Sequence, residues 1–117
     1  MAASDRFCIE IKGKGGHGAA PQHTVDAIVE AAALVTSLQT IVSRSKDPLE
    51  SGVLTCGMIN GGYGYNIIAD HVRIDGTCRS FTKDVQEMIK SRMHTVCCGV
   101  AQTYGGEIDL HYECKEP

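Results

Sequence analysis

The sequence contains no long hydrophobic run. No uninterrupted apolar stretch approaches the roughly 18 residues that a membrane-spanning helix needs, and the N-terminus lacks the apolar core of a signal peptide. We therefore expect no membrane association and a cytoplasmic location. The chain has 11 Lys and Arg residues against 14 Asp and Glu residues, a net charge of -3, which does not predict a nucleic-acid-binding surface.

The sequence also lacks the spacings that hold a catalytic metal. Its 6 cysteines form no C-x-x-C pair, and no set of Asp, Glu and His residues has the spacing of a metal site. No Ser or Cys nucleophile has an evident general base. We therefore expect no metal site and no complete active site in this chain. We interpret the cysteines as small buried thiols of a reducing compartment.

The most informative segment is the glycine-rich stretch GKGGHGAAP at residues 13–21. It places His17 between a predicted strand and a predicted helix. Glycine permits positive φ angles and close approach to a ligand, and Pro21 restricts the residue before it, so the loop favours the presentation of His17. Histidine readily donates, accepts or ligates near neutral pH. The alternative is a flexible turn with an incidental exposed histidine.

The same loop matches the dinucleotide-binding pattern G-x-G-x-x-G through Gly13, Gly15 and Gly18. That motif requires its last glycine to open a helix and an acidic residue about 20 positions later, after the next strand. Here Pro21 and His23 follow the loop, and the later position falls inside the predicted helix. The pattern therefore does not predict nucleotide binding.

Hydrophobic periodicity predicts four strands and two helices. Alternating apolar residues predict strands at 7–12, 72–79 and 108–113, and a further strand is predicted at 53–60. Helical spacing predicts helices at 25–42 and 82–104, with Thr24 and Thr82 as N-caps and Gly105 as the C-terminal stop. The order β-α-β-β-α-β predicts an α+β, ferredoxin-like fold, in which a four-stranded antiparallel sheet carries two helices on one face and its first and last strands are neighbours.

Two further polar residues lie close to predicted strand ends. Asn66 lies in a glycine-rich loop between the second and third strands, and Arg79 lies on the polar face of the third strand. Such an asparagine usually only completes a turn, and an exposed arginine is usually solvated. The sharper interpretation of Arg79 is a guanidinium fork for a carboxylate. His17, Asn66 and Arg79 can stabilise charge and hold a carboxylate, but they do not make a complete active site.

These motifs, in their order along the chain, resemble the lid domain of the amidohydrolase branch of the zinc aminoacylase/carboxypeptidase family. That branch includes hippurate hydrolase, N-acyl-amino-acid amidohydrolases and auxin-conjugate hydrolases. The resemblance covers roughly residues 7–112. Its motifs are GKGGHGAAP at 13–21, TVD at 24–26, LQTIVSR at 38–44, DPL at 47–49, GG at 61–62, NII at 66–68 and GTCRSF at 76–81.

The resemblance implies that residues 1–117 are the lid and dimerisation domain of a larger two-domain metallohydrolase of N-acyl amino acids or small peptides. It implies that zinc or another divalent metal lies in the other domain, where a metal-bound water attacks the amide carbonyl, so this chain alone is inactive. It also implies a homodimer through the first helix and a sheet edge. The wide apolar surface of helix 25–42 and the apolar strand 53–59 fit that arrangement.

The resemblance also implies a role for each candidate residue. His17 matches the lid histidine that stabilises the oxyanion of the tetrahedral intermediate in the partner subunit's active site. Asn66 matches an asparagine that holds the substrate or the intermediate. Arg79 matches an arginine that binds the free carboxylate of the substrate. The alternative function is a stand-alone ferredoxin-like assembly module with no catalytic role.

Overall fold

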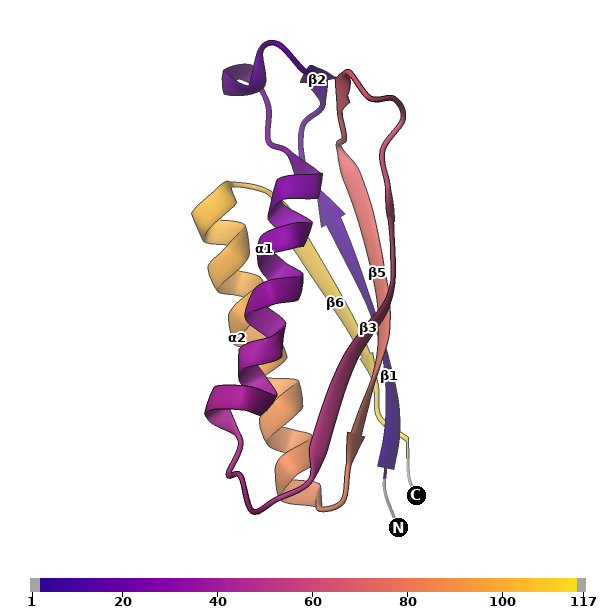
Figure 1. The fold of residues 1–117 in the computed structure, drawn as a ribbon, viewed down its shortest axis with the longest axis vertical. Helices are drawn as coiled ribbons and strands as arrows, with labels where there is room; N and C mark the ends of the chain where they lie inside the picture. Colours follow the sequence, from indigo (N-terminus) through magenta and orange to yellow (C-terminus); the bar gives the residue numbers. More distant parts are fainter. Residues whose placement is uncertain (1–2, 116–117) are drawn as a thin grey trace.

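The computed structural model describes residues 3–115 and has the predicted ferredoxin-like topology (Figure 1). The strands are β1 (Ala3–Lys12), β2 (Gly16–His17), β3 (Gly52–Gly61), β4 (Ile67–Ile68), β5 (His71–Ser80) and β6 (Glu107–Glu113). The helices are η1 (Pro21–His23), α1 (Ala27–Thr40), η2 (Ile41–Ser45) and α2 (Lys83–Tyr104). The long strands and helices confirm the predicted order, whereas the two-residue strands β2 and β4 were not predicted.

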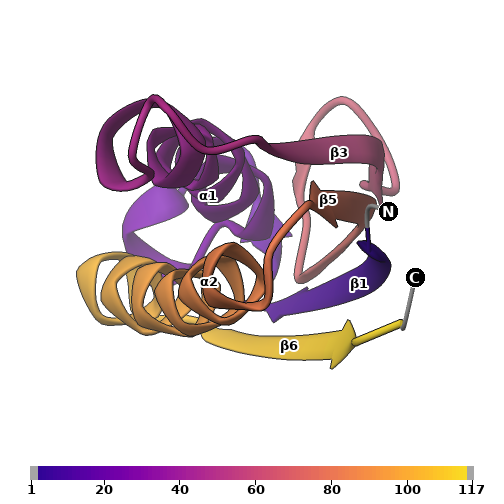
Figure 2. The same cartoon turned by 90° about the horizontal axis from the view of Figure 1, so that it is seen from below.

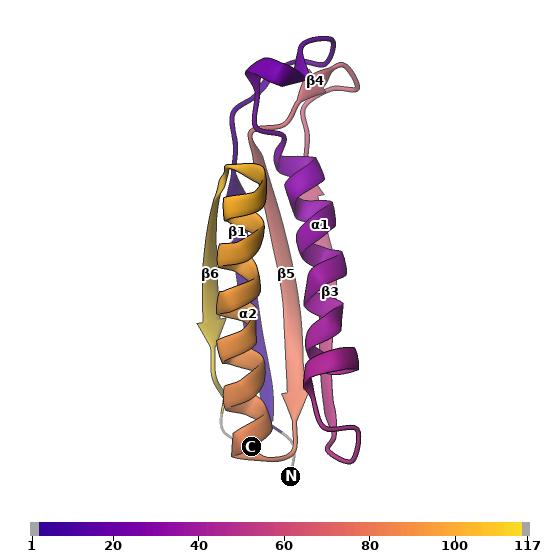
Figure 3. The same cartoon turned by 90° about the vertical axis from the view of Figure 1, so that its left-hand side faces the viewer.

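The main sheet is antiparallel and has the strand order β3-β5-β1-β6. Strands β1 and β6 are neighbours, as predicted, with Ile9 opposite Leu110. Both helices cover one face of this sheet, α1 on the side of β3 and α2 on the side of β6 (Figures 2 and 3). The chain ends emerge at one end of the domain, and β2 and β4 lie at the opposite end (Figures 1 and 3).

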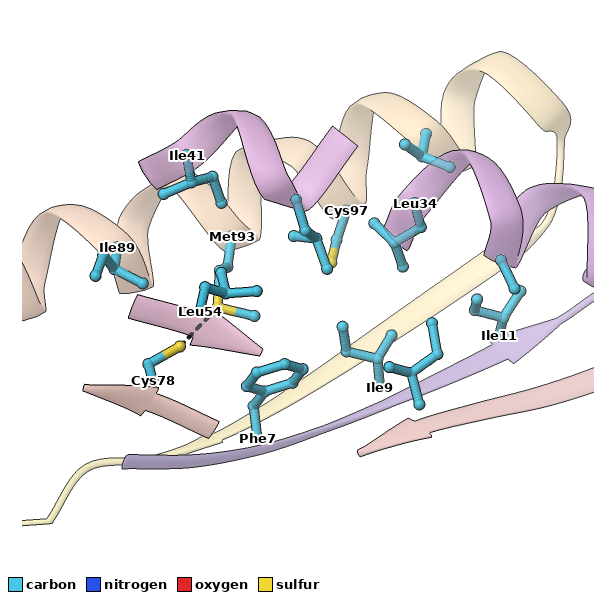
Figure 4. Close-up of a cluster of buried hydrophobic side chains, with 14 of the residues drawn as sticks. Phe7, Ile9, Ile11, Leu34, Ile41, Leu54, Cys78, Ile89, Met93 and Cys97 are labelled. Carbon is cyan, nitrogen blue, oxygen red and sulfur yellow. Dashed lines mark hydrogen bonds between the residues drawn. The ribbon is translucent and has the colours of Figure 1, made fainter. Parts of the chain in front are cut away.

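The core fills the space between the helices and the inner face of the sheet (Figure 4). Side chains alternate along a strand, so Phe7, Ile9 and Ile11 of β1 all point inward and are buried. A Cβ at Gly76 would lie 2.3 Å from Cζ of Phe7 and 2.2 Å from the Thr55 carbonyl oxygen, so only glycine fits beneath this ring. The Phe7 ring therefore lies directly over Gly76 of the neighbouring strand β5.

The first turn of α1 differs from the prediction. Asp26, not Thr24, is the N-cap, because its Oδ1 accepts hydrogen bonds from the amides of Ile28 and Val29 at 3.0 and 3.3 Å. The Thr24 hydroxyl instead donates to the Pro21 carbonyl at 2.7 Å and closes η1. A carboxylate at a helix N-terminus also interacts favourably with the helix dipole. The helix therefore begins after Asp26, two positions later than predicted.

Both predicted ends of α2 are confirmed. The Thr82 hydroxyl accepts a hydrogen bond from the Val85 amide at 3.2 Å, as an N-cap does. Gly105 ends the helix with φ +91°, a left-handed conformation that favours glycine.

The helical segment Ala27–Ser45 has 19 residues and a mean hydropathy of 1.2, so by length and composition alone it could span a membrane. The absence of a long uninterrupted apolar run predicted no segment of this kind. The segment contains Glu30 and Arg44, and it buries Leu34 and Leu38 in the core. A helix that packs one face on a core passes the same test of length and composition, so the finding is weak evidence for a membrane span.

The expectation of buried thiols holds for only part of the set. Cys78 and Cys97 are buried, and burial raises the pKa of each thiol to about 12, so both remain protonated and inert. Cys98 and Cys114 are exposed, which the sequence pattern did not predict.

Glu30 is an exception in this apolar core. Its side chain lies on the buried face of α1 and is 0% exposed, and neither carboxylate oxygen makes a hydrogen bond of normal geometry within residues 3–115. A Cβ at Gly106 would come within 2.3 Å of its Oε2. Burial raises the pKa of Glu30, and the nearby Gly106 amide offsets this only in part.

We predict that Glu30 makes the domain less stable as pH rises. The unfolded chain loses the Glu30 proton at the ordinary glutamate pKa, whereas the folded chain keeps it to a higher pH, so the free energy of unfolding falls across that window. Glu30→Gln should remove this slope, which urea unfolding at pH 5 and pH 8 would measure. The exposed Glu87→Gln is the control, and equal pH slopes in both variants would contradict the prediction.

Candidate functional site

The structure brings the His17 loop and the Asn66 loop together at the end of the domain opposite the chain termini (Figure 1). Strands β2 and β4 pair there, with His17 opposite Ile67. Next to this pair, the Gly18 amide donates to the Asn66 carbonyl at 2.9 Å. Two residues that the sequence placed in separate loops therefore share one two-stranded ribbon, which we call the tip ribbon (residues 16–18 and 66–68).

Backbone and side-chain hydrogen bonds hold the tip ribbon to the main sheet. The Gly13 amide donates to the Asp70 carbonyl at 2.8 Å, and the Tyr63 hydroxyl donates to Asp70 Oδ1 at 2.6 Å. The second bond raises the pKa of Tyr63. Gly62 has φ +101°, which lets the chain turn back towards β4. Asp70 thus fixes both loops, a role that nothing in the sequence pattern pointed to.

One hydrogen bond sets the protonation pattern of His17. Its ring is exposed, and its Nδ1 accepts a hydrogen bond from the Ala19 amide at 3.0 Å. A nitrogen that accepts a hydrogen bond carries no proton, so the neutral ring has its proton on Nε2. His17 therefore presents an N–H donor to whatever lies beyond the tip.

Asn66 lines a cleft of about 320 Å³ between its own loop and the first turn of α1. The walls of the cleft include Gly18, Ile28, Tyr65 and Ile67. Asp26 also lies on this cleft, but its Oδ1 is already engaged by two backbone amides. Asn66 therefore offers a carboxamide in a partly apolar cleft beside the residue that follows His17.

Arg79 lies at the other end of the sheet. It is exposed on β5, between Ser4 of β1 and Val53 of β3. Eight residues separate it from His71, which begins β5 next to the tip ribbon, so at the usual strand rise these two residues are about 26 Å apart. The longest dimension of the domain is 50 Å. The structure therefore does not bring Arg79 to His17 and Asn66 within one chain.

Between these two ends, charged side chains on the open face of the sheet pair with one another. Arg73 donates two hydrogen bonds to Asp75 at 2.9 and 3.1 Å, and Glu10 pairs with both His71 and Arg73. Within residues 3–115, no three His, Cys, Asp or Glu side chains cluster closely enough to hold a metal ion.

We predict that ¹⁵N NMR of the neutral His17 ring will show a protonated Nε2 and an unprotonated Nδ1. The exposed His94 on α2 has no such bond to a backbone amide among the described residues, and its ring should show a mixture of tautomers. The same tautomer mixture in both rings would contradict the geometry of the His17 loop.

Comparison with known proteins places the chain in a family. Residues 4–101 match the model of the peptidase dimerisation domain. An N-acetyldiaminopimelate deacetylase of Limosilactobacillus reuteri is 45% identical over 110 residues, which cover 94% of this chain and 29% of the relative. The N-acetyl-L-cysteine deacetylase of Bacillus subtilis is 42% identical over 117 residues, which cover 100% of this chain and 28% of the relative.

Solved structures of known proteins support the same assignment to a family. A protein of methicillin-resistant Staphylococcus aureus, described as an aminohydrolase, matches with a TM-score of 0.96 at 36% identity over 99% of this chain and 31% of that one. The YXEP protein of Bacillus subtilis, a dinuclear metal binding peptidase, matches with a TM-score of 0.75 at 27% identity over 100% of this chain and 27% of that one. The chain spans less than a third of the length of these relatives. With its fold and most of its length matched, the chain belongs to the dimerisation domain family of the M20 peptidases.

Proposed function

We propose that residues 1–117 form the lid and dimerisation domain of a longer, metal-dependent enzyme that hydrolyses N-acyl amino acids or small peptides. In this proposal His17, Asn66 and Arg79 complete an active site whose other residues lie outside this chain. The observation that carries the proposal is the placement of these three residues at opposite ends of one rigid sheet. They can serve one substrate only if two copies of the domain come together.

The edge of β3 supports such an assembly. This strand has ten residues, GVLTCGMING, and none of them is charged or proline. Its outer edge has no neighbouring strand in the sheet order, and Val53, Met58 and Ile59 are more than half exposed. A long uncharged edge invites pairing with another strand. The opposite edge, β6, carries Glu107, Asp109 and Glu113 and is protected by these charges.

The adjacent face of α1 extends the same surface. Ile28 and Val29 are 48% and 50% exposed, although α1 buries its other face in the core. A helix that is apolar on both sides needs a second partner. We therefore propose a two-fold symmetric homodimer in which β3 pairs with β3 of the second copy, with the α1 helices close by.

Antiparallel pairing of the two β3 strands explains the separation of the site residues. Strand β3 starts at Gly52, beside Ser80, and ends at Gly61, beside Val72 and close to the tip ribbon. Antiparallel pairing places the Gly61 end of one copy beside the Gly52 end of the other. The tip ribbon of one subunit then lies at the end of the partner that carries the chain termini and Arg79 (Figure 1).

Each residue then has a distinct chemical task. The neutral His17 donates from Nε2 to the oxygen on which charge develops when the amide carbonyl is attacked, and such a donor typically contributes about 100- to 1,000-fold in rate. Asn66 offers a carboxamide to the same end of the substrate. Arg79 offers a guanidinium fork to a free carboxylate. The two deacetylase relatives are named for N-acetylated amino acids, which carry both groups.

Among residues 3–115, no three His, Cys, Asp or Glu side chains cluster to hold a metal ion, and the proposal assigns the metal to segments outside this chain. The relative described as a dinuclear metal binding peptidase supports this assignment, since this chain covers 27% of it. The chain itself stabilises charge and positions the substrate.

We predict that this chain is a dimer in solution and that Ile59→Lys weakens it. A lysine buried in the β3 interface would raise the dimer Kd by about 10-fold or more. Size exclusion with light scattering over a range of concentrations measures this. His111→Lys on the charged strand β6 is the matched control and should leave the dimer intact. A strict monomer for the unaltered chain would contradict β3 pairing.

We predict that two impaired variants of the full-length enzyme recover activity when mixed. His17→Ala should lower kcat about 100- to 1,000-fold, and Arg79→Ala should mainly raise KM for substrates with a free carboxylate. Each mixed dimer has one site with both wild-type residues and one site with neither. Random mixing should therefore give intact sites at about a quarter of the wild-type number. Activity is assayed at substrate concentrations below KM.

The alternatives give different results in the mixing experiment. If His17 and Arg79 of the same chain served one site, every site in the mixed dimer would carry one defect and no activity would return. If the domain served only for assembly, activity would depend on neither residue. A normal kcat for His17→Ala would therefore contradict its catalytic assignment.

A further inference from the structure

We infer that Tyr65 is a specificity residue that contacts the acyl group of the amide substrate. This inference rests on the proposed function and adds a substrate contact to it. Tyr65 precedes Asn66 directly and is 103% exposed, the most exposed of the large hydrophobic residues described. At this exposure the ring is not packed against the described residues of its own chain, and it lies next to the proposed substrate-binding amide of Asn66.

The loop that carries Tyr65 is held in place. The Ile67 amide donates to the Gly64 carbonyl at 3.3 Å, and the Asn66 carbonyl accepts from Gly18. The neighbouring Tyr63 is fixed by its bond to Asp70. The Tyr65 ring is therefore presented on an ordered backbone and has only two side-chain torsions to fix. An aromatic side chain in that situation makes contacts at a low cost in conformational entropy.

Tyr65 also borders the cleft of about 320 Å³ at the tip. Ile28 and Ile67 supply further apolar wall, and Asn66 and Asp26 supply polar groups, of which Asp26 Oδ1 is engaged by backbone amides. Small-molecule sites combine a mostly apolar lining with a few polar groups at volumes of roughly 300 Å³ and above. The cleft therefore has the chemistry of an acyl chain or ring attached to a carbonyl.

The position of Tyr65 decides which part of the substrate it contacts. Arg79 holds the carboxylate at the other end of the composite site, whereas His17 and Asn66 act on the carbonyl oxygen. The acyl group is attached to that carbonyl and extends away from the amino acid. A residue on the tip ribbon side, adjacent to Asn66, therefore lies beside the acyl group rather than beside the amino-acid side chain.

The test compares N-acetyl and N-benzoyl derivatives of one amino acid as substrates of the full-length enzyme. Tyr65→Ala should lower kcat/KM for the benzoyl substrate about 10-fold more than for the acetyl substrate, because an aromatic contact is lost. Tyr65→Phe keeps the ring and should retain the wild-type ratio. Because the side chain is exposed, both variants should keep the wild-type Tm and dimer mass.

An unchanged or increased benzoyl-to-acetyl ratio in Tyr65→Ala would overturn the inference. His17→Ala in the same assay separates this failure from failure of the proposed function. It should lose activity on both substrates alike if the tip serves the active site. Loss in His17→Ala with an unchanged ratio in Tyr65→Ala rejects only the acyl contact. Normal activity in His17→Ala, or no hydrolysis of either substrate by the wild type, rejects both.

Discussion

The length of the sheet is the constraint on which the rest of this structure depends. Strands β1, β3 and β5 each have ten residues, and their hydrogen bonds make them a rigid spacer between the tip ribbon and the end that carries the termini. No rotation of a side chain can bring His17 to Arg79 across that distance. The domain can therefore contribute these residues to one substrate only as a pair of copies. The uncharged edge of β3 provides the surface on which such a pair can form.

The distribution of charge over the surface limits where that pairing can occur. On the open face of the sheet, carboxylates and cations neutralise one another, as Arg73 and Asp75 do. Edge β6 carries acidic side chains, one of which pairs with Lys12 at 3.5 Å. Strand β3 and the exposed face of α1 have no comparable protection, and they lie side by side (Figure 3). Val53, Met58 and Ile59 on β3 and Ile28 and Val29 on α1 are exposed there without exposed charged neighbours on their own elements, which fits an assembly surface.

Sequence periodicity was sufficient for the long elements but not for the site. Alternation in β1 and helical spacing in α2 both report burial on one face, so their type and order could be predicted. Thr24 and Asp26 are both acceptable N-caps, and only the bond from Thr24 to Pro21 decides between them. The tip ribbon is too short to show a hydrophobic period. Asp70, which bonds to Gly13 and Tyr63 beside the ribbon, belongs to no motif in the sequence. The distance of Arg79 from His17 follows from strand register, which residue types alone do not encode.

The tautomer of His17 bears on how the proposed composite site would hold a substrate. Because Nδ1 accepts from the Ala19 amide, the neutral ring presents its Nε2–H at the tip. In the proposed dimer, the guanidinium of Arg79 is a permanent cation at the other end and would hold the free carboxylate of a substrate. In that arrangement the amide carbonyl of the substrate would lie towards His17 and Asn66. The backbone hydrogen bond within the glycine-rich loop would then help to orient the substrate, because it fixes which ring nitrogen of His17 donates.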